Sequence, residues 1–296
     1  MILPHEHLFT DLRGPALPDY AQADPEAVVQ RMSPFLEEAH RVGVTAFVEC
    51  STVGVGRNIQ ILQKLSSATP IHIIAPTGLY RDAYVPSSMR DFTVDQFAQL
   101  WIHDLTIGIE DTTTLAGFIK ISMSDDGPTP LEKRILAAAA MASKETGAVI
   151  ASHTSNGDVF NKQIRILENF GLDPSRFIWV HANLEPDNKL HLRAAEKGYY
   201  VEFDAIGASW QPQEAMVNSS ISLIKAGYED NILLSHDAGW YQPGHIHGEP
   251  EGGYRGFVDL VESFIPTLIS KNVPRETIIQ ITHENPKLAF GLKHKL

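Results

Sequence analysis

The chain has 296 residues, of which 43% are apolar, with 36 acidic against 24 basic side chains and a formal charge of −12, a balance that argues against nucleic-acid binding. The single cysteine, Cys50, excludes an internal disulfide and a cysteine-based zinc cluster, and it suits a reducing compartment. No apolar run reaches the roughly 20 residues that span a bilayer and no signal peptide stands out, so we expect a cytoplasmic protein without membrane contact.

Short apolar runs alternate with helical patterns along the chain. The expected strand and helix pairs are 2–7 and 25–42, 45–50 and 58–65, 71–75 and 93–109, 117–121 and 129–144, 148–153 and 159–170, 177–181 and 187–197, 199–203 and 214–226, and 231–237 and 257–269, with a last helix at 275–290. The clearest helix start is at Thr129, where Pro130 and Glu132 complete a capping box. Loops are expected at 79–91 and 238–255.

Eight strand–helix units predict a single α/β domain over residues 1–296, folded as a (β/α)8 TIM barrel. The alternative is a doubly wound open sheet with a dinucleotide site. Gly54-Val55-Gly56 lacks the third glycine that such a site needs, which favours the barrel.

Side chains that bind metals stand at the ends of several expected strands. Residues two apart in a strand point to one face, so the first strand offers both its histidines to the same site. In TIM barrels the carboxyl ends of the strands carry the chemistry. The residues that meet there are His5, His7, Lys120, His153, His181 and Asp237.

Each of these residues also has a structural interpretation, because a single histidine or aspartate at a strand end is common. Together, their nitrogen and oxygen donors suit zinc or manganese. Six positions exceed the needs of one tetrahedral ion, which favours two metals. Lys120 lies among apolar residues, where an unpaired ammonium is costly. A neutral lysine can react with CO2 to give a carbamate, an anionic ligand.

These residues and their neighbours resemble the phosphotriesterase family of the amidohydrolase superfamily, which includes phosphotriesterase-like lactonases. The likeness covers nearly the whole chain, including Pro4-His5-Glu6-His7-Leu8, Thr77-Gly78-Leu79-Tyr80, Gly117-Phe118-Ile119-Lys120, Ser235-His236-Asp237 and Glu284-Asn285-Pro286. Members usually have a longer leading segment, so we expect either a less covered barrel bottom or a start further upstream.

The resemblance implies a binuclear site. By that likeness, His5, His7 and Asp237 hold the more buried metal, and His153 and His181 hold the more exposed one. A carboxylated Lys120 and a hydroxide would bridge the two. Two cations lower the pKa of the water between them, and Asp237 would carry its proton to the leaving group. Zinc is the first choice of metal, with manganese, cobalt or iron as alternatives.

The expected activity is hydrolysis of a lactone or related carboxylic ester, with a small molecule as the only partner apart from a homodimer. By the same likeness, Tyr80 contacts the lactone. The alternatives are a phosphotriesterase, a phosphorylated-sugar lactonase, a metal-dependent amidase and a silent binding protein. A phosphorylated substrate needs a cationic cradle; Arg57, Arg81 and Arg255 are candidates, and Arg255 is the predicted substrate contact.

Other polar residues stand outside this set of ligands. His245 and His247 in the 238–255 loop repeat the opening spacing without a strand to fix them, so we expect them either to play no part or to act as a weak extra ligand. Asp204 is expected either to hold the leaving group, to support a histidine or to be structural.

Overall fold

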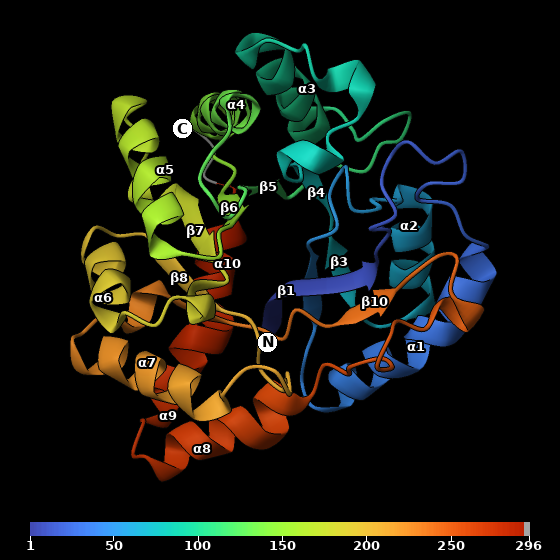
Figure 1. The fold of residues 1–296 in the computed structure, drawn as a ribbon. Helices are drawn as coiled ribbons and strands as arrows, with labels where there is room; N and C mark the ends of the chain where they lie inside the picture. Colours follow the sequence, from blue (N-terminus) through green and yellow to red (C-terminus); the bar gives the residue numbers. More distant parts are fainter. Residues whose placement is uncertain (293–296) are drawn as a thin grey trace.

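The computed structural model describes residues 1–292, in which helices surround a ring of strands (Figure 1). The strands are β1 (Ile2–Phe9), β2 (Ala46–Glu49), β3 (His72–Ile74), β4 (Pro76–Leu79), β5 (Phe118–Ser122), β6 (Ile150–His153), β7 (Phe177–Val180), β8 (Tyr200–Phe203), β9 (Ile232–Leu234) and β10 (Gly239–Tyr241). The helices are α1 (Pro25–Arg41), α2 (Ile59–Ala68), α3 (Val94–Thr106), α4 (Pro130–Thr146), α5 (Gly157–Asn169), α6 (Asn188–Glu196), α7 (Gln213–Lys225), α8 (Ile265–Ser270), α9 (Arg275–Ile279) and α10 (Asn285–Phe290).

The strands pair in parallel in two arcs, ordered β10-β1-β2-β3 and β4-β5-β6-β7-β8-β9, and both arcs belong to one ring. On one side, β3 continues into β4 through Ala75. On the other, the N–H of Asp237 donates to the carbonyl of His5 (3.2 Å) and the N–H of His7 donates to the carbonyl of Ala238 (2.9 Å). β9 and β10 thus share one strand position, the predicted barrel is confirmed, and the open sheet is excluded.

A buried carboxylate fastens the last strand position to the first. Glu6 of β1 accepts hydrogen bonds from the hydroxyl of Ser235 (2.8 Å), the N–H and Nδ1 of His236 (3.1 and 2.7 Å) and the N–H of Ala238 (3.1 Å). Nε2 of His236 accepts in turn from the N–H of Leu260 (3.0 Å). The backbone N–H groups of the segment between β9 and β10 therefore find hydrogen-bond acceptors although no strand ladder continues there.

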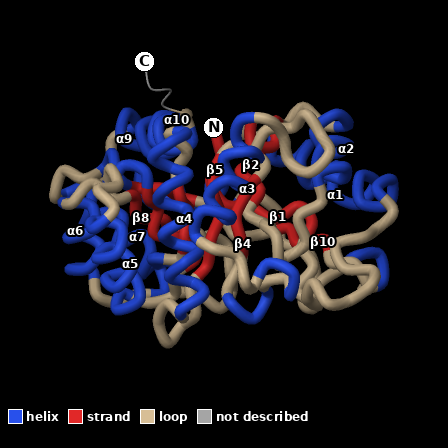
Figure 2. Tube along the Cα trace, turned by 90° about the horizontal axis from the view of Figure 1, so that it is seen from above, coloured by secondary structure: helices blue, strands red, loops and turns tan. Residues whose placement is uncertain are grey.

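Side chains alternate along each strand, so the apolar residues form two clusters, one between the strands and the helices and one inside the barrel. Ile119 and Ile121 face the helices, whereas Phe118 faces the barrel interior, where its ring meets Phe290 of α10 edge-on at 5.2 Å. α10 lies at the same end of the molecule as the start of the chain (Figure 2). Lys120 shares the inward face of Phe118 but lies one step nearer the other end. The interior thus changes from apolar to polar along the barrel.

Several expected elements differ in detail from the structure. The strands expected at 71–75 and 231–237 are each divided, at Ala75 and between β9 and β10, and the 238–255 loop contains β10. The helices expected at 257–269 and 275–290 contain π-helical turns at residues 260–264 and 280–284. Pro266 and Pro286 follow these turns closely, and a proline offers no N–H to continue the regular ladder. Among residues 1–292, no helix has both the length and the apolarity to cross a membrane.

Candidate metal centre

The carboxyl ends of the strands enclose a cavity of about 70 Å³ that brings all six predicted ligands together. They come from β1, β5 and β6, from the residue after β7 and from the gap between β9 and β10. The lining residues are His5, His7, Thr10, Leu12, Cys50, Val55, Tyr80, Lys120, His153, His181, Asp237 and Trp240. Cys50, which is buried, also lines this cavity, and no part in the site was predicted for it.

Two groups of donor atoms converge within the cavity. In the first, Oδ1 of Asp237 lies 3.1 Å from Nε2 of His7 and 3.7 Å from Nε2 of His5. In the second, Nε2 of His181 lies 2.7 Å from Nδ1 of His153. His5 and His181 link the groups, since their rings lie 5.1 Å apart. The arrangement offers nitrogen and carboxylate donors to two neighbouring points, as a pair of divalent cations requires.

Lys120 lies beside these donors and is almost fully buried, with 2% of its surface exposed. Its Nζ has no hydrogen-bond partner among the described residues, and the same holds for Oδ1 of Asp237 by hydrogen-bond criteria. An unpaired buried ammonium is costly. Both atoms become satisfied if cations occupy the cavity and Lys120 is converted into an anionic ligand, so the residues present fit a cation pair.

Buried acceptors orient the imidazoles from behind. Nδ1 of His5 contacts Oε1 of Glu202 (2.7 Å), and Nδ1 of His181 contacts Oδ1 of Asp204 (2.8 Å). Nδ1 of His7 contacts the hydroxyl of Ser51 (2.8 Å). Each contact leaves the opposite ring nitrogen facing the cavity, which is how carboxylates orient histidine ligands.

Of the three roles considered for Asp204, the structure shows contact with a histidine, whereas no role was predicted for Glu202. A signal was available in the sequence, because Glu202 and Asp204 are acidic residues two apart at the end of an apolar strand. Two carboxylates buried at one strand end each need a hydrogen-bond donor beside them, because an unpaired buried charge is costly. Only the partners' identity was missing from the sequence.

The backbone is strained at two of the converging residues. His181 and Asp237 have φ values of 63° and 50°, in the left-handed region that side chains rarely adopt. His181 follows β7 directly, and its N–H donates to Oδ2 of Asp204 (2.8 Å). Such strain persists where surrounding contacts hold it, and it is concentrated at functional sites.

Electrostatics favour neutral imidazoles and an ionised carboxylate in the cavity. Burial, and next the positive charge of Lys120, lower the pKa of His5 to about 3. Burial and the neighbouring His181 lower the pKa of His153 well below its usual value. Burial alone would raise the pKa of Asp237, but the nearby imidazoles of His7, His5 and His181 lower it below the ordinary range. Neutral imidazole and ionised carboxylate are the forms that bind metals.

Tyr80, the residue after β4, reaches the cavity. Its hydroxyl lies 3.4 Å from Nδ1 of His153, and burial raises its pKa to about 12, so the phenol stays protonated at neutral pH. Gly78 permits this approach, because a Cβ there would lie 2.0 Å from the carbonyl oxygen of Lys120 and its φ is 111°.

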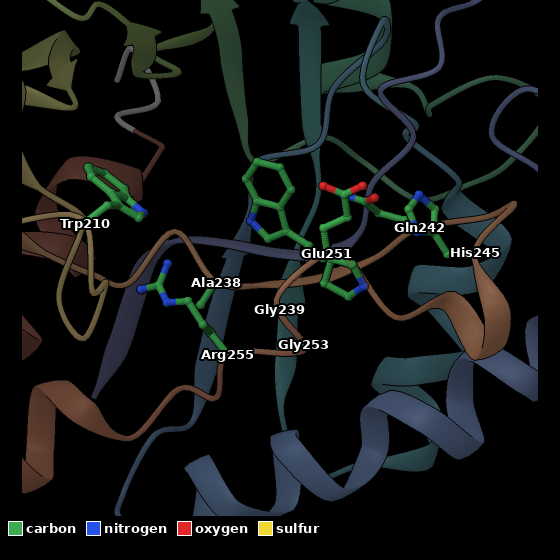
Figure 3. A pocket seen from close by; sticks show the side chains of 10 residues that line it. Trp210, Ala238, Gly239, Gln242, His245, Glu251, Gly253 and Arg255 are labelled. Carbon is green, nitrogen blue, oxygen red and sulfur yellow. The ribbon is translucent and has the colours of Figure 1, made fainter.

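A larger outer pocket of about 440 Å³ lies beside the cavity, and Trp240 lines both. Figure 3 shows side chains entering it from Trp210 after β8, from the segment around β10 and from the loop before α8. The other lining residues are Ala238, Gly239, Gln242, His245, Pro250, Glu251, Gly253 and Arg255. His245 thus faces this pocket rather than the donor cluster.

The three candidate arginines have different surroundings. Arg57 is buried and bonds the carboxylates of Asp104 and Glu110, away from the cavity lining. Arg255 lines the outer pocket and donates to the carbonyls of Ile206, His236 and Asp237 at 2.8–3.2 Å. Arg81 lies beside His153, with 2.5 Å between Nη2 and Nε2.

Comparison with known proteins agrees with this geometry. Residues 1–290 match the phosphotriesterase family. The chain is 32% identical over 301 residues to an aryldialkylphosphatase of Saccharolobus solfataricus, covering 98% of this chain and 94% of that protein. It is 29% identical to an N-acetyltaurine hydrolase of Xenopus tropicalis over 83% of this chain and 72% of that protein. A solved structure from the engineering of organophosphate hydrolysis on a weak promiscuous lactonase template superposes with a TM-score of 0.86, at 27% identity, covering 98% of this chain and 95% of that one.

Proposed function

Because the chain belongs to the phosphotriesterase family of metal-dependent hydrolases, which act on ester or amide bonds, we propose that it is a binuclear lactonase or carboxylic ester hydrolase. The observation that carries the proposal is the convergence of two donor groups on the unpartnered amine of Lys120. One cation would be held by His5, His7 and Asp237, and the other would be held by His153 and His181. A carboxylated Lys120 would be a ligand of both. Two such cations supply Lewis acidity and a nucleophilic hydroxide at neutral pH.

The chain's own residues do the remaining work. Asp237, ionised and next to His7, accepts the proton of the attacking water and passes it to the leaving group. Tyr80 donates its phenolic hydrogen to the substrate near His153. Arg255 holds the backbone carbonyls of His236 and Asp237, and so supports the proton acceptor while its side chain lines the outer pocket for the substrate.

The preference for a lactone is supported by the lactonase template among the similar structures, and by a protonated tyrosine suited to a carbonyl oxygen. A phosphotriesterase, as the name of the Saccharolobus relative suggests, or a phosphorylated-sugar lactonase is the second candidate. An amidase is the third, because the same donors serve an amide and a relative is named an N-acetyltaurine hydrolase.

Substrate profiling with and without metal tests the proposal. Treatment with a chelator should abolish hydrolysis, and zinc should restore it more fully than manganese, cobalt or iron. A lactone should exceed a paraoxon-like triester and an N-acyl amide by about tenfold or more in kcat/KM, or about 1.4 kcal/mol. A sugar-lactone phosphate assayed beside a neutral lactone shows which of the two lactone classes is preferred. Activity that persists without metal would contradict a binuclear site, and a larger rate with the amide or triester would replace the lactone assignment.

Substitution Lys120→Met tests the ligand role of the lysine. The methionine fills nearly the same volume and removes a buried amine that lacks a partner, so the metal-free protein should melt at the same or a higher temperature. The metal content should fall below that of the parent, together with activity. Carbon-13 NMR of the parent in labelled bicarbonate should show a carbamate signal that the variant lacks. Full metal content in the variant would show that Lys120 is not a ligand.

A further inference from the structure

Arg81 is a cation at the edge of the donor cavity that the proposed chemistry leaves without a role. It follows Tyr80 directly, and its guanidinium lies over that ring, 5.4 Å from the centroid. Nη2 lies 2.5 Å from Nε2 of His153, and Nη1 lies 3.5 Å from a carboxylate oxygen of Asp125. Nε is buried and has no hydrogen-bond partner among residues 1–292. Arg81 therefore has donors that its surroundings do not use fully.

The backbone that carries Arg81 is fixed, while its outward contact is weak. The N–H of Tyr80 donates to the carbonyl of Val53 (3.0 Å), and the N–H of Tyr84 donates to the carbonyl of Arg81 (2.8 Å). The side chain of Asp125 is 64% exposed, and an exposed ion pair at 3.5 Å contributes little. The guanidinium can thus change partners by side-chain rotation alone.

The contact with His153 also depends on the state of that ring. A guanidinium only donates, so Nε2 of His153 accepts here while Nδ1 faces His181 and Tyr80. This step rests on the proposed function: if Nδ1 gives its lone pair to a cation, Nε2 carries the ring proton and no longer accepts. Arg81 then needs another acceptor at the same place.

We infer that Arg81 binds an oxyanion group of the substrate, a carboxylate, phosphate or sulfonate, at the edge of the cavity beside His153. Its planar fork matches two oxygens of such a group. The other two arginines lack this freedom, because Arg57 is held by Asp104 and Glu110 and Arg255 by backbone carbonyls. The preferred substrates are therefore anionic members of the ester or lactone class.

The experiment compares Arg81→Gln with Arg81→Lys and with a matched control, Arg90→Gln, in the metal-loaded enzyme. Arg90 lies in the same loop and bonds Asp82 (2.5 Å), so its loss tests general loosening of the loop. The substrates are a γ-butyrolactone carrying a carboxylate and its uncharged carboxamide. R81Q should lower kcat/KM for the carboxylate about 10- to 100-fold, mostly through KM, and that for the carboxamide less than about threefold. R81K should retain part of the preference, and R90Q all of it.

A binding measurement separates this inference from the proposed function. Calorimetric titration of metal-loaded protein with inorganic phosphate, acetate and methanesulfonate should show weaker binding to R81Q than to R90Q, and the order of affinities identifies the oxyanion. If the parent enzyme hydrolyses neither lactone, the lactonase proposal is overturned, and the titration still tests the role of Arg81. Equal losses on both substrates, or equal anion affinity in R81Q and the parent, would overturn the inference, because Arg81 would then only position His153.

Discussion

Replacing Asp237 by asparagine is expected to lower kcat by about 10³-fold while the protein stays folded. Its Oδ1 lies 3.1 Å from Nε2 of His7 and has no hydrogen-bond partner among the described residues, so it is the carboxylate placed to take up a proton. Loss of a positioned general base costs about 10²–10⁴-fold, and the weaker amide ligand adds to that loss.

Asparagine is a better test than alanine because of the backbone at this position. The φ of 50° lies in the left-handed region, which asparagine tolerates and alanine does not. Melting by circular dichroism should stay close to that of the parent, and Asp237→Ala should melt lower with the same loss of turnover. The matched control is Asp91→Asn, an exposed aspartate outside the cavity, which should keep full activity. If D237N keeps activity within a few fold, the proton-transfer role is wrong.

Replacing Glu6 by alanine is expected to cause the largest loss of stability, about 3–5 kcal/mol, or roughly 10 °C in melting temperature. The carboxylate is fully buried and accepts from Ser235, His236 and Ala238. Its removal leaves these donors buried without acceptors, which costs more than the bonds themselves contribute. β9 is not paired with β1 in a continuous ladder, so the closure of the ring at this point depends on these side-chain hydrogen bonds.

Two further variants make the stability test sharper. Glu6→Gln keeps one acceptor oxygen but presents an amide NH2 to another donor, so its melting temperature should lie between those of the parent and E6A. Glu26→Ala removes a surface carboxylate paired with Lys64, and the melting temperature should change by no more than about 1 °C. Differential scanning calorimetry measures all three. If the melting temperature of E6A also stays within about 1 °C of that of the parent, the carboxylate of Glu6 does not hold the ring closed.

The amino-acid sequence by itself determined the features that repeat over short distances. Alternation along a strand places Lys120 with Phe118 and His5 with His7, whatever lies on the other side of the barrel. The capping box at Thr129 starts α4, as its sequence predicts. Eight such units close into a barrel that gathers the strand ends, so the set of converging residues followed from the order of the elements.

Tertiary structure alone decided which partners the polar side chains have. The three candidate arginines looked equivalent in the sequence. In the structure, Arg57 is held by carboxylates, Arg255 is held by backbone carbonyls, and Arg81 lies beside a histidine. Glu6 and Glu202 likewise meet histidines that are distant in the chain. The physical reason is that a periodic pattern is encoded within a single strand or helix. A hydrogen bond between distant residues depends instead on how the whole ring closes. The division of the last strand position into β9 and β10 shifts the register there, and the register decides which groups of that position face β1.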